Sequence, residues 1–569
     1  MSAHDLSRRE WLSHVSLPAL GLSLGAVAPS VVRELPPSAD TPGARVYNVR
    51  EFGAKGDGTT LDTRAVQEAI DTCHRESGGT VLVPAGVFHV GTLELKSNVT
   101  LYLAAAATLL GSADGKQYHA VDAIPLTGDS TLNDGNWALI FAVDAQNVTI
   151  DGPGLIDGQG IQFHAPQRGA APPSGLGGLR RPYHLLFYRC EHLRVRNVRL
   201  WQSAYHSVRV IQCKHVLMDG LHIYNRVNGN NDGFHFISAE HVAVSNCTVQ
   251  SQDDACALFG SCKHITVTNC YFSTRWSVIR FGGGVVEHIA VSNCVLHRVY
   301  GCPIKLHGSP GSRFEHLSFS NLLLDDVTGP INVSVGPRSN PGTPGTPSTS
   351  AAPVPPPDDR APGIVRNVSF SNIHGAVTTN PPPLPGYPFT SDYRPGELHN
   401  CITLNAVGGS IVENITFDDV HLTFGGGGTA EDAARRDVPE IAGEYFMLGP
   451  MPAYALYARN VRALTLQNVR FQTAQPDLRP AVVFDHVEDV AVNGASIQGH
   501  PQGESVLRFA ATRDALLTAV RLLAPAPVFL QLEGAGNQGI KIDGGDLSKA
   551  ARPLAFRDGA TAQAVTMRA

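Results

Sequence analysis

Four short polar segments of this chain recur at nearly even spacing and carry the residue types that acid–base chemistry needs. Two of the segments hold carboxylates and two hold cations, in the order Asn230-Asn231-Asp232, Asp253-Asp254, Arg280 and Lys305. The steps are 22 residues from Asp232 to Asp254, 26 residues from Asp254 to Arg280, and 25 residues from Arg280 to Lys305. If each step is one turn of a repeating fold, the four positions lie one above another on one face. Crowded carboxylates raise one another's pKa, which places a proton donor beside a base.

Cleavage of a glycosidic bond is one reaction that such a column can perform. It needs a carboxylic acid that protonates the leaving oxygen and a carboxylate that activates water or attacks the sugar. The three Asp residues supply these groups, while Arg280 and Lys305 can hold a substrate carboxylate. A structural alternative stays open, because paired Asp residues also cap the corners of turns.

The sequence around these residues repeats, which indicates how the fold positions them. Short runs that alternate apolar and polar residues each follow a His and close at Asn197, Asp219, Asn246, Asn269, Asn293 and Asn321. The steps between these closing residues are 22, 27, 23, 24 and 28 residues. Alternation with period two is typical of a strand, and Asn tolerates the left-handed turn after it. A strand-only repeat with a period in the twenties predicts a β-solenoid.

The recurrent His and Cys residues of the repeat are interpreted as structural residues and not as metal ligands or catalytic groups. One His precedes each strand, and because a coil supplies only one, we interpret these residues as a surface or corner ladder and expect no metal. The ten cysteines match no familiar zinc or disulfide spacing. Cys247, Cys270 and Cys294 occupy one place in successive repeats, which predicts a column of buried thiols. Cys256 and Cys262 are the pair in which we would look first for a disulfide. We expect no cofactor.

The motifs resemble the polygalacturonase family of glycoside hydrolases, family twenty-eight. The resemblance rests on Asn230-Asn231-Asp232, Asp253-Asp254 and Ile304-Lys305 in that order, and on the segment 49–58, which looks like the opening of that family and of related pectin-degrading β-helices. It covers residues 46–321 well and the C-terminal third more weakly. It implies an all-β, right-handed parallel β-helix of the pectin lyase-like type. It also implies a glycosidase that cleaves a pectic or related uronic-acid-containing polysaccharide by inversion.

The resemblance also assigns roles to individual residues. Asp253 would be the general acid, and Asp232 with Asp254 would hold the water. Lys305 would bind the sugar carboxylate beside the cleaved bond, and Asn230 would support Asp232.

Two positions depart from the family pattern. The family has Gly-His-Gly where this chain has Arg275-Trp276-Ser277, and it has Arg where this chain has Pro303. Arg280 is therefore a candidate for the missing guanidinium, and His235 or His307 for the missing imidazole. Trp276 is a further candidate for substrate binding.

Two other functions remain open on the same scaffold. A calcium-dependent polysaccharide lyase would use the Asp cluster for metal and Arg280 or Lys305 as its base. A carbohydrate-binding or adhesive solenoid would have lost its chemistry, as the missing His and Arg favour and the three carboxylates oppose.

One domain is expected over residues 46–544, followed by a C-terminal tail at 545–569. Insertions at 336–363, 378–399 and 425–454 are predicted to be long loops at the rim of the binding groove. Residues 62–74 are predicted to form a helix that begins at the N-cap residue Asp62 and covers the open end of the solenoid. Its apolar positions follow helical spacing, at Val66, Ala69, Ile70 and Cys73.

The N-terminus and the composition bound location and partners. Arg8-Arg9 before a weakly apolar run predicts a twin-arginine signal peptide at 1–33, with a linker at 34–45, and thus an exported bacterial protein of the periplasm or exterior. The net charge of −6 gives no basic footprint for nucleic acid. No later apolar run reaches the length of a membrane helix. We expect a monomer that binds a polysaccharide or oligosaccharide.

Overall fold

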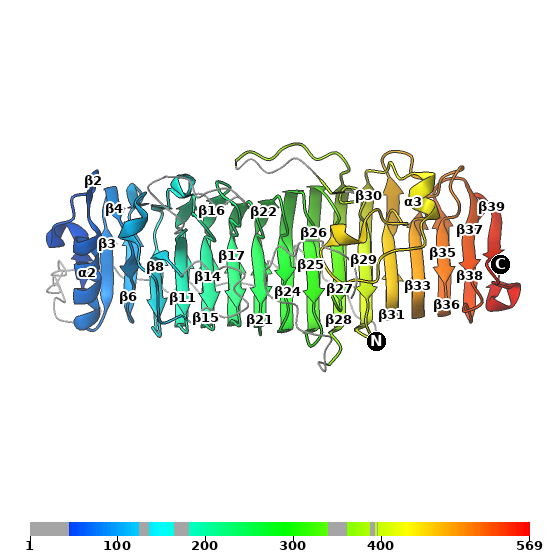
Figure 1. Cartoon of the computed structure of the whole chain (residues 1–569), viewed down its shortest axis with the longest axis horizontal. Helices are drawn as coiled ribbons and strands as arrows, with labels where there is room; N and C mark the ends of the chain where they lie inside the picture. Colours follow the sequence, from blue (N-terminus) through cyan, green and yellow to red (C-terminus); the bar gives the residue numbers. More distant parts are fainter. Residues whose placement is uncertain are drawn as a thin grey trace, which may run out of the picture. The chain divides into compact units, whose positions relative to one another are not determined.

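The computed structural model describes residues 45–124, 136–163, 181–338, 361–386, 393–394 and 396–568. The chain divides into the units Met1–Thr41 and Pro42–Ala569, and every described residue belongs to the second. There, forty parallel-paired strands wind into a right-handed parallel β-helix (Figure 1). The predicted fold class is therefore confirmed. The predicted signal peptide, and the linker up to residue 44, lie outside the described residues.

Equivalent strands of successive coils pair side by side and form three ladders. The first ladder begins with β1 (Val46–Asn48), β3 (Gly79–Val83), β6 (Val99–Leu103), β9 (Thr149–Asp151), β12 (Glu191–Arg196), β15 (Lys214–Asp219), β18 (Glu240–Ser245) and β21 (Lys263–Thr268). The second begins with β2 (Asp57–Leu61), β4 (Gly86–Val90), β7 (Ala107–Gly111), β10 (Leu155–Asp157), β13 (Arg199–Trp201), β16 (His222–Asn225), β19 (Thr248–Ser251) and β22 (Tyr271–Thr274).

The third ladder carries the candidate site. It runs through β5 (Leu93–Glu94), β8 (Ala138–Val143), β11 (Tyr183–Tyr188), β14 (Val208–Ile211), β17 (Phe234–Ile237), β20 (Cys256–Phe259), β23 (Ile279–Phe281), β25 (Ile304–Gly308), β27 (Ile331–Val335) and β29 (Ile402–Ala406).

Longer strands continue the ladders toward the C-terminus. The first and second ladders are joined in β24 (Val285–Val299), β26 (Arg313–Val327), β28 (Ile364–Val377), β30 (Ile411–Phe424) and β36 (Arg513–Leu522). The third and first are joined in β31 (Leu456–Gln467) and β33 (Val482–Asn493). The remaining strands are β32 (Arg470–Thr473), β34 (Ser496–Ile497), β35 (Leu507–Ala510), β37 (Ala526–Glu533), β38 (Ile540–Asp546), β39 (Ala550–Arg557) and β40 (Val565–Arg568). The ladders thus pass the boundary predicted at residue 544, because β39 pairs with β37 and β40 with β38.

The turns between the strands explain the closing Asn residues of the repeat. Asn197, Asn246, Asn269, Asn293 and Asn321 all have φ between 54° and 64°, in the left-handed region that Asn tolerates. At the remaining coil, Gly220 takes this conformation (φ 65°) in place of the expected Asp219. The period was therefore interpreted correctly, and one closing residue was placed one position early.

The recurrent His residues form the corner ladder that the sequence predicts. The six rings are exposed, and each residue has φ between 55° and 58°. Successive rings stack with centroids 4.9–5.1 Å apart, in the order His192, His215, His241, His264, His288 and His316. Stacking of one His per coil along the surface accounts for the repeat.

All ten cysteines are buried free thiols, including Cys256 and Cys262, which are not joined. In the predicted column, the backbone N–H of Cys247 donates to Sγ of Cys270 at 3.4 Å.

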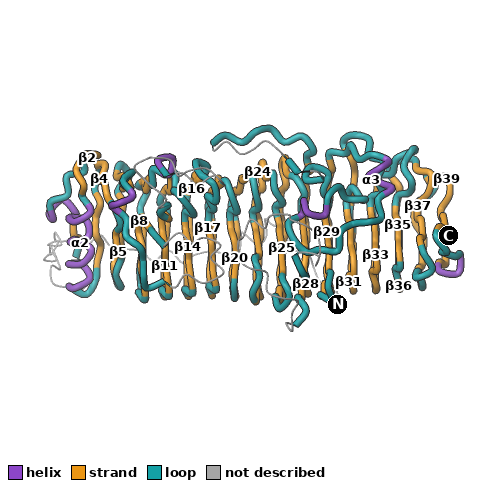
Figure 2. The backbone as a smooth tube through the Cα atoms, in the orientation of Figure 1, coloured by secondary structure: helices purple, strands orange, loops and turns teal. Residues whose placement is uncertain are grey.

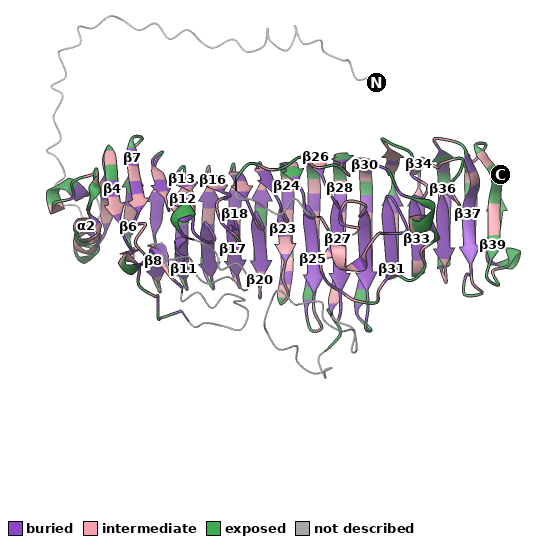
Figure 3. Cartoon of the chain, turned by 45° about the horizontal axis from the view of Figure 1, so that its top comes forward, coloured by how far each residue is buried: buried purple, intermediate pink, exposed green. Residues whose placement is uncertain are grey.

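The described helices are short apart from α2, which lies at the N-terminal end of the solenoid (Figure 2). They are α2 (Thr63–Arg75), α3 (Ala430–Ala434) and the 3₁₀ helices η1 (Val49–Phe52), η2 (Gly115–Gln117), η3 (Gly160–Gln162), η4 (Tyr445–Leu448) and η5 (Ala562–Ala564). No helix in the described ranges is long and apolar enough to cross a membrane. Figure 3 shows buried residues along the strands and exposed residues mainly at turns and ends.

Helix α2 closes the first coil and buries the four predicted apolar residues. Asp62 stands at its N-cap position but makes no side-chain capping bond. Its carboxylate instead accepts the backbone N–H groups of Lys55 at 2.7 Å and Gly56 at 2.9 Å. The expected capping role of Asp62 is therefore wrong, because its oxygens bind the turn that precedes the helix.

A buried column of aromatic rings offers a test of how coil stacking stabilises the fold. Phe370 lies between Phe319 and Phe417, with ring centroids 5.1 and 4.9 Å away. We expect Phe370→Ala to lower the free energy of unfolding by about 3–5 kcal/mol, from lost burial and a residual cavity. Leu323→Ala on β26, where Leu323 is 54% exposed, is the control and should cost less than about 0.5 kcal/mol. Denaturant titration of both variants measures the difference, and equal losses would contradict this account.

Candidate active site

Two of the three candidate carboxylates come from turns that precede strands of the third ladder. Asp232 stands two residues before β17, and Asp254 stands two residues before β20. The N–H of Gly233 donates to the carbonyl oxygen of Asp254 at 2.9 Å, so these two Asp residues occupy equivalent positions on adjacent coils. Both residues are buried, at 4% exposure. The sequence therefore predicted the proximity of these two Asp residues correctly.

The two cations come from the strands that follow. Arg280 on β23 pairs in register with Lys305 on β25, and the same row continues back through Ala257 to His235. The row lies three residues beyond the position of the carboxylates. The expectation that all four positions lie one above another is therefore wrong. The 26-residue step from Asp254 to Arg280 consists of one coil and this offset of three residues. The charges still meet, because Nη1 of Arg280 lies 3.5 Å from Oδ2 of Asp254.

Asp253 lies at the surface end of this cluster and is half-buried. Its Oδ2 accepts a hydrogen bond from Nδ2 of Asn230 at 3.4 Å. Asn230 thus contacts Asp253 and not Asp232, contrary to the expectation from the resemblance. Oγ1 of Thr274 on the next coil donates to the Asp253 carbonyl at 2.6 Å, which holds the backbone of the acidic pair in place.

Asn231 holds the turn that presents Asp232. Its buried side chain accepts the N–H groups of Val227 at 3.0 Å and Asn228 at 2.6 Å. Its Nδ2 donates to the carbonyl oxygens of Ser203 at 3.0 Å and Tyr205 at 2.8 Å. Two of these hydrogen bonds close the turn itself and two connect it to the preceding coil, so Asn231 acts as a positioning residue.

Two imidazoles stand beside Asp232. Nδ1 of His235 lies 2.8 Å from Oδ2 of Asp232, and Nε2 of His206 lies 3.6 Å from the same oxygen. The two rings stack with centroids 4.5 Å apart. His235 was a candidate from sequence, whereas His206 was missed, although it occupies the position of Asp232 one coil earlier. An imidazole is thus present at the carboxylate cluster despite the missing Gly-His-Gly motif.

Glu444, which sequence reasoning did not single out, binds both cations. Its Oε2 accepts a hydrogen bond from Nζ of Lys305 at 2.7 Å, and its Oε1 lies 3.2 Å from Nη2 of Arg280. It stands in the insertion 425–454, just before η4, so that insertion does border the site. The ammonium group that the resemblance assigns to a sugar carboxylate is therefore already paired with a carboxylate of this chain.

The remaining candidates line the same end of the site. The ring of Trp276 is half-buried, with its centroid 4.7 Å from Nζ of Lys305. His307 is buried, and its Nε2 is 2.8 Å from Oδ1 of Asn332. Its Nδ1 lies 3.9 Å from Oε1 of Glu444, so His307 belongs to the cation cluster and not to Asp232.

Burial and crowding shift the acidities of the site. Burial, followed by the charge of Asp254, raises the pKa of Asp253 to about 7. Burial and the charges of Asp253 and Asp254 raise the pKa of Asp232 well above its ordinary value. Burial, followed by Arg209 and Arg280, lowers the pKa of His235, which stays neutral. A carboxyl with a pKa near 7 keeps much of its proton at neutral pH, as a general acid requires.

His206, Asp232 and His235 also form a geometric set of possible metal ligands, with ligand atoms within 4.8 Å of one another. In the structure these atoms face one another in hydrogen-bond or near hydrogen-bond contacts. The expectation of no metal stays a prediction.

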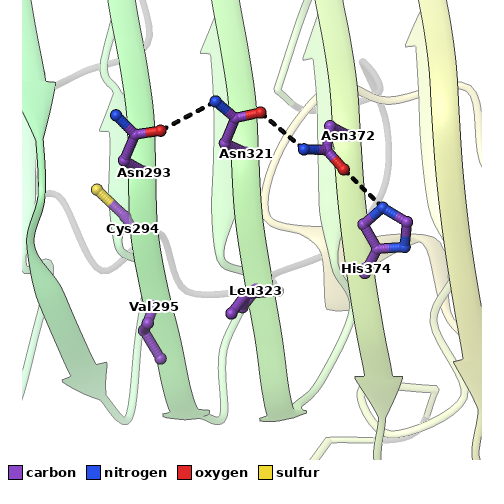
Figure 4. Close-up of a pocket in the computed structure, with 7 residues that line it drawn as sticks. All are labelled: Asn293, Cys294, Val295, Asn321, Leu323, Asn372 and His374. Atoms are coloured by element: carbon purple, nitrogen blue, oxygen red, sulfur yellow. Dashed lines mark hydrogen bonds between the residues drawn. The ribbon is translucent and has the colours of Figure 1, made fainter. Parts of the chain in front are cut away.

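A separate pocket lies on the other two ladders (Figure 4). It is lined by Asn293, Cys294, Val295, Asn321, Leu323, Asn372 and His374. Its amides bond to one another, since Nδ2 of Asn321 donates to Asn293 at 2.9 Å and Nδ2 of Asn372 donates to Asn321 at 2.8 Å. No carboxylate lines this pocket, and its polar groups are occupied by the turn ladder.

The family model of Glycosyl hydrolases family 28 matches residues 73–380, more than half of the 569-residue chain. An exo-poly-alpha-D-galacturonosidase of Dickeya chrysanthemi is 30% identical in an alignment of 253 residues that covers 37% of this chain and 41% of that protein. A probable polygalacturonase of Vitis vinifera is 31% identical in an alignment of 221 residues that covers 37% of this chain and 43% of that protein. The match spans less than half the length of each of these two relatives.

Among solved structures, the fold is similar to a hyperthermoactive exopolygalacturonase from Thermotoga maritima. The TM-score is 0.54 at 18% identity, over 75% of this chain and 92% of that one. At this identity the likeness concerns the fold.

The raised pKa of Asp253 predicts a pH-dependent cost to stability. An acid whose pKa is higher in the folded than in the unfolded chain stabilises the fold fully below about pH 4, and this contribution is lost as pH rises through about 7. Asn keeps the shape and stays neutral. We therefore expect Asp253→Asn to melt at a higher temperature than the unsubstituted protein at pH 8, with the advantage disappearing at pH 4.

The control for this measurement is Asp543→Asn, since Asp543 is exposed on β38. Thermal melts of the three proteins between pH 4 and 8 check the prediction. Parallel pH profiles for Asp253→Asn and the unsubstituted protein would contradict it.

Proposed function

This chain belongs to Glycosyl hydrolases family 28, and we propose that it is an exported glycosidase. Its substrate is a pectic or related uronic-acid-containing polysaccharide, which it cleaves with inversion at the anomeric carbon. The observation that carries the proposal is the meeting of Asp232, Asp253 and Asp254 on adjacent coils, with a pKa of about 7 at Asp253. The polygalacturonase names of the relatives support the substrate class.

In this mechanism Asp253 is the proton donor. It gives its proton to the glycosidic oxygen, and the bond between that oxygen and the anomeric carbon breaks. Asp254 takes a proton from a water molecule, whose oxygen attacks the anomeric carbon from the opposite face. Asp232, held by His235 at 2.8 Å, positions that water. The reaction consumes one water and restores the protonated acid after exchange with solvent.

The positions of the two cations argue against the lyase alternative. A lyase would need Arg280 or Lys305 as a base, yet both are bound to Glu444. Burial acts to lower the pKa of Arg280, but Glu444 and the three Asp residues raise it above its ordinary value. A guanidinium held this firmly in its charged form is a poor proton acceptor. Products that absorb ultraviolet light would nevertheless identify a lyase.

Export is the part of this proposal that rests on sequence alone. The paired Arg8-Arg9 before the apolar run supports a twin-arginine route to the periplasm or the exterior. The proposed enzyme acts as a monomer, binds polysaccharide and uses no cofactor.

Removal of the acid tests the mechanism directly. Asp253→Asn preserves the shape of the side chain but has no proton to give, so we expect turnover of a natural glycoside to fall about 10²–10⁴-fold. Activated aryl glycosides, whose leaving groups need no protonation, should lose less than about tenfold. Release of reducing ends and of the aryl group measures the two rates.

The exposed substitution Asp543→Asn is again the matched control and should leave both rates unchanged. Near-normal turnover of a natural glycoside by Asp253→Asn would remove Asp253 from the role of general acid.

The stereochemical outcome tests inversion. Inverting enzymes keep their two carboxyl groups far enough apart to admit a water, so the first product should have the anomeric configuration opposite to that of the cleaved bond. Proton NMR of the product within the first minutes, before mutarotation, makes this measurement. A first product that retains the configuration would overturn the proposed mechanism and leave glycosidase activity intact.

A further inference from the structure

Lys305 is fully buried and forms an ion pair with the carboxylate of Glu444. Its side chain is 0% exposed, and its Nζ donates to Oε2 of Glu444 at 2.7 Å. The other oxygen of Glu444 lies 3.2 Å from Arg280, which also lies 3.5 Å from Asp254. Both cations of the site therefore already have carboxylate partners. Burial acts to raise the pKa of Glu444, but Lys305, Arg280 and His307 hold it well below its ordinary value.

The segment that carries Glu444 is fastened to the solenoid just before it. The N–H of Ala442 donates to the carbonyl oxygen of Pro337 at 2.7 Å. The N–H of Gly443 donates to Oγ of Ser334 at 3.3 Å, and Nδ2 of Asn405 donates to the carbonyl oxygen of Ile441 at 2.9 Å. Ser334 lies on β27, which pairs with β25, and Asn405 lies on β29, which pairs with β27, so the ladder itself sets the approach of Glu444.

The residue just after Glu444 is fixed as firmly. Tyr445 is fully buried, and its hydroxyl donates to Oε1 of Glu397 at 2.8 Å. The same oxygen accepts a hydrogen bond from Nη2 of Arg275 at 2.9 Å. Nδ2 of Asn400 donates to the carbonyl oxygen of Tyr445 at 3.0 Å.

A small apolar core, separate from the main one, packs beneath this insertion. It consists of Cys401, Val438, Leu448, Met451, Ala453, Tyr457 and Val483. Anchors on both sides of Glu444 and an apolar core under the segment oppose displacement of this carboxylate.

A substrate carboxylate at this position would meet a poor environment. It would find both cations already paired and a fixed negative charge within its own hydrogen-bond radius. Like charges at short range in a buried site repel strongly, and displacing Glu444 would break two buried ion pairs. Sugar hydroxyls fit better, because a carboxylate accepts O–H donors.

We propose that the sugar seated against Glu444, whose carboxylate covers Lys305, carries no charge, either as a neutral sugar or as a uronate whose carboxyl group is esterified. This inference rests on the proposed function and narrows its substrate class. The polymer is then either a pectic chain with neutral sugars beside uronates or an esterified pectic chain. Sugars at other positions of the bound polymer are free to carry carboxylates.

The test compares three matched sets of oligosaccharides: galacturonates with free carboxyl groups, their methyl esters, and analogues with a neutral sugar beside the cleaved bond. For the unsubstituted protein we expect kcat/KM at least tenfold higher on an uncharged set than on the free acids. The esterified and neutral sets distinguish the two sources of the uncharged sugar. Glu444→Gln keeps the shape of the side chain and removes the negative charge that is paired with Lys305. It should therefore raise kcat/KM on the free acids at least tenfold.

Glu440→Gln is the matched control, since Glu440 is an exposed acid four residues earlier in the same insertion. It removes the same charge and should leave the preference unchanged. A preference of the unsubstituted protein for free acids, or a fall in their turnover in Glu444→Gln, would overturn the inference.

Failure of the proposed function gives a different result. If none of the three sets is cleaved, the proposed function fails, and calorimetric binding of the same sets decides the inference. Free acids that bind Glu444→Gln more tightly than the unsubstituted protein support it, and equal binding to both proteins overturns it.

Discussion

The pairing of each coil with the next, at about 4.8 Å, is the constraint on which the rest of the structure depends. It brings residues of equal register on successive coils into contact. Apolar side chains in such a row can stack on one another, whereas charged side chains in a row need partners that neutralise them. The row of Phe319, Phe370 and Phe417 gains ring stacking. The row that contains Arg280 and Lys305 sets two cations side by side. A regular solenoid has no residue in that row that can neutralise both.

An element outside the repeat supplies the balance. Glu444 lies between the two cations because the insertion that carries it is anchored to β27 and β29 on one side of the ladder. The turn positions of Asp232 and Asp254 create the opposite problem, since two carboxylates occupy equivalent places. There, crowding and burial raise the pKa of Asp253 and Asp232. Burial, followed by the charge of the adjacent Asp254, therefore creates the acid at Asp253, and the insertion determines what the cations can still bind.

Much of the fold was open to prediction because its signals are local. A strand that alternates apolar and polar residues, and an Asn that accepts positive φ, can be recognised within a few residues. The buried face of α2 follows from helical spacing in the same way. Asp62 shows where local reasoning ends, because its position is that of an N-cap while its oxygens bind Lys55 and Gly56. The end of the solenoid was also predicted too early, since the pairing of β39 with β37 depends on partners and not on the period.

The sequence by itself determined the coil repeat, the three candidate carboxylates and the family of the chain. The order of motifs and the period of a repeat can be recognised without knowing which residues contact one another. Only the tertiary structure decided which groups those carboxylates face. Arg280 reaches back across a three-residue offset to Asp254, His206 joins Asp232 from the preceding coil, and Asn230 contacts Asp253. Glu444 meets Lys305 across 139 residues, and no local pattern encodes such a contact, because it arises from the packing of an irregular insertion against a regular ladder.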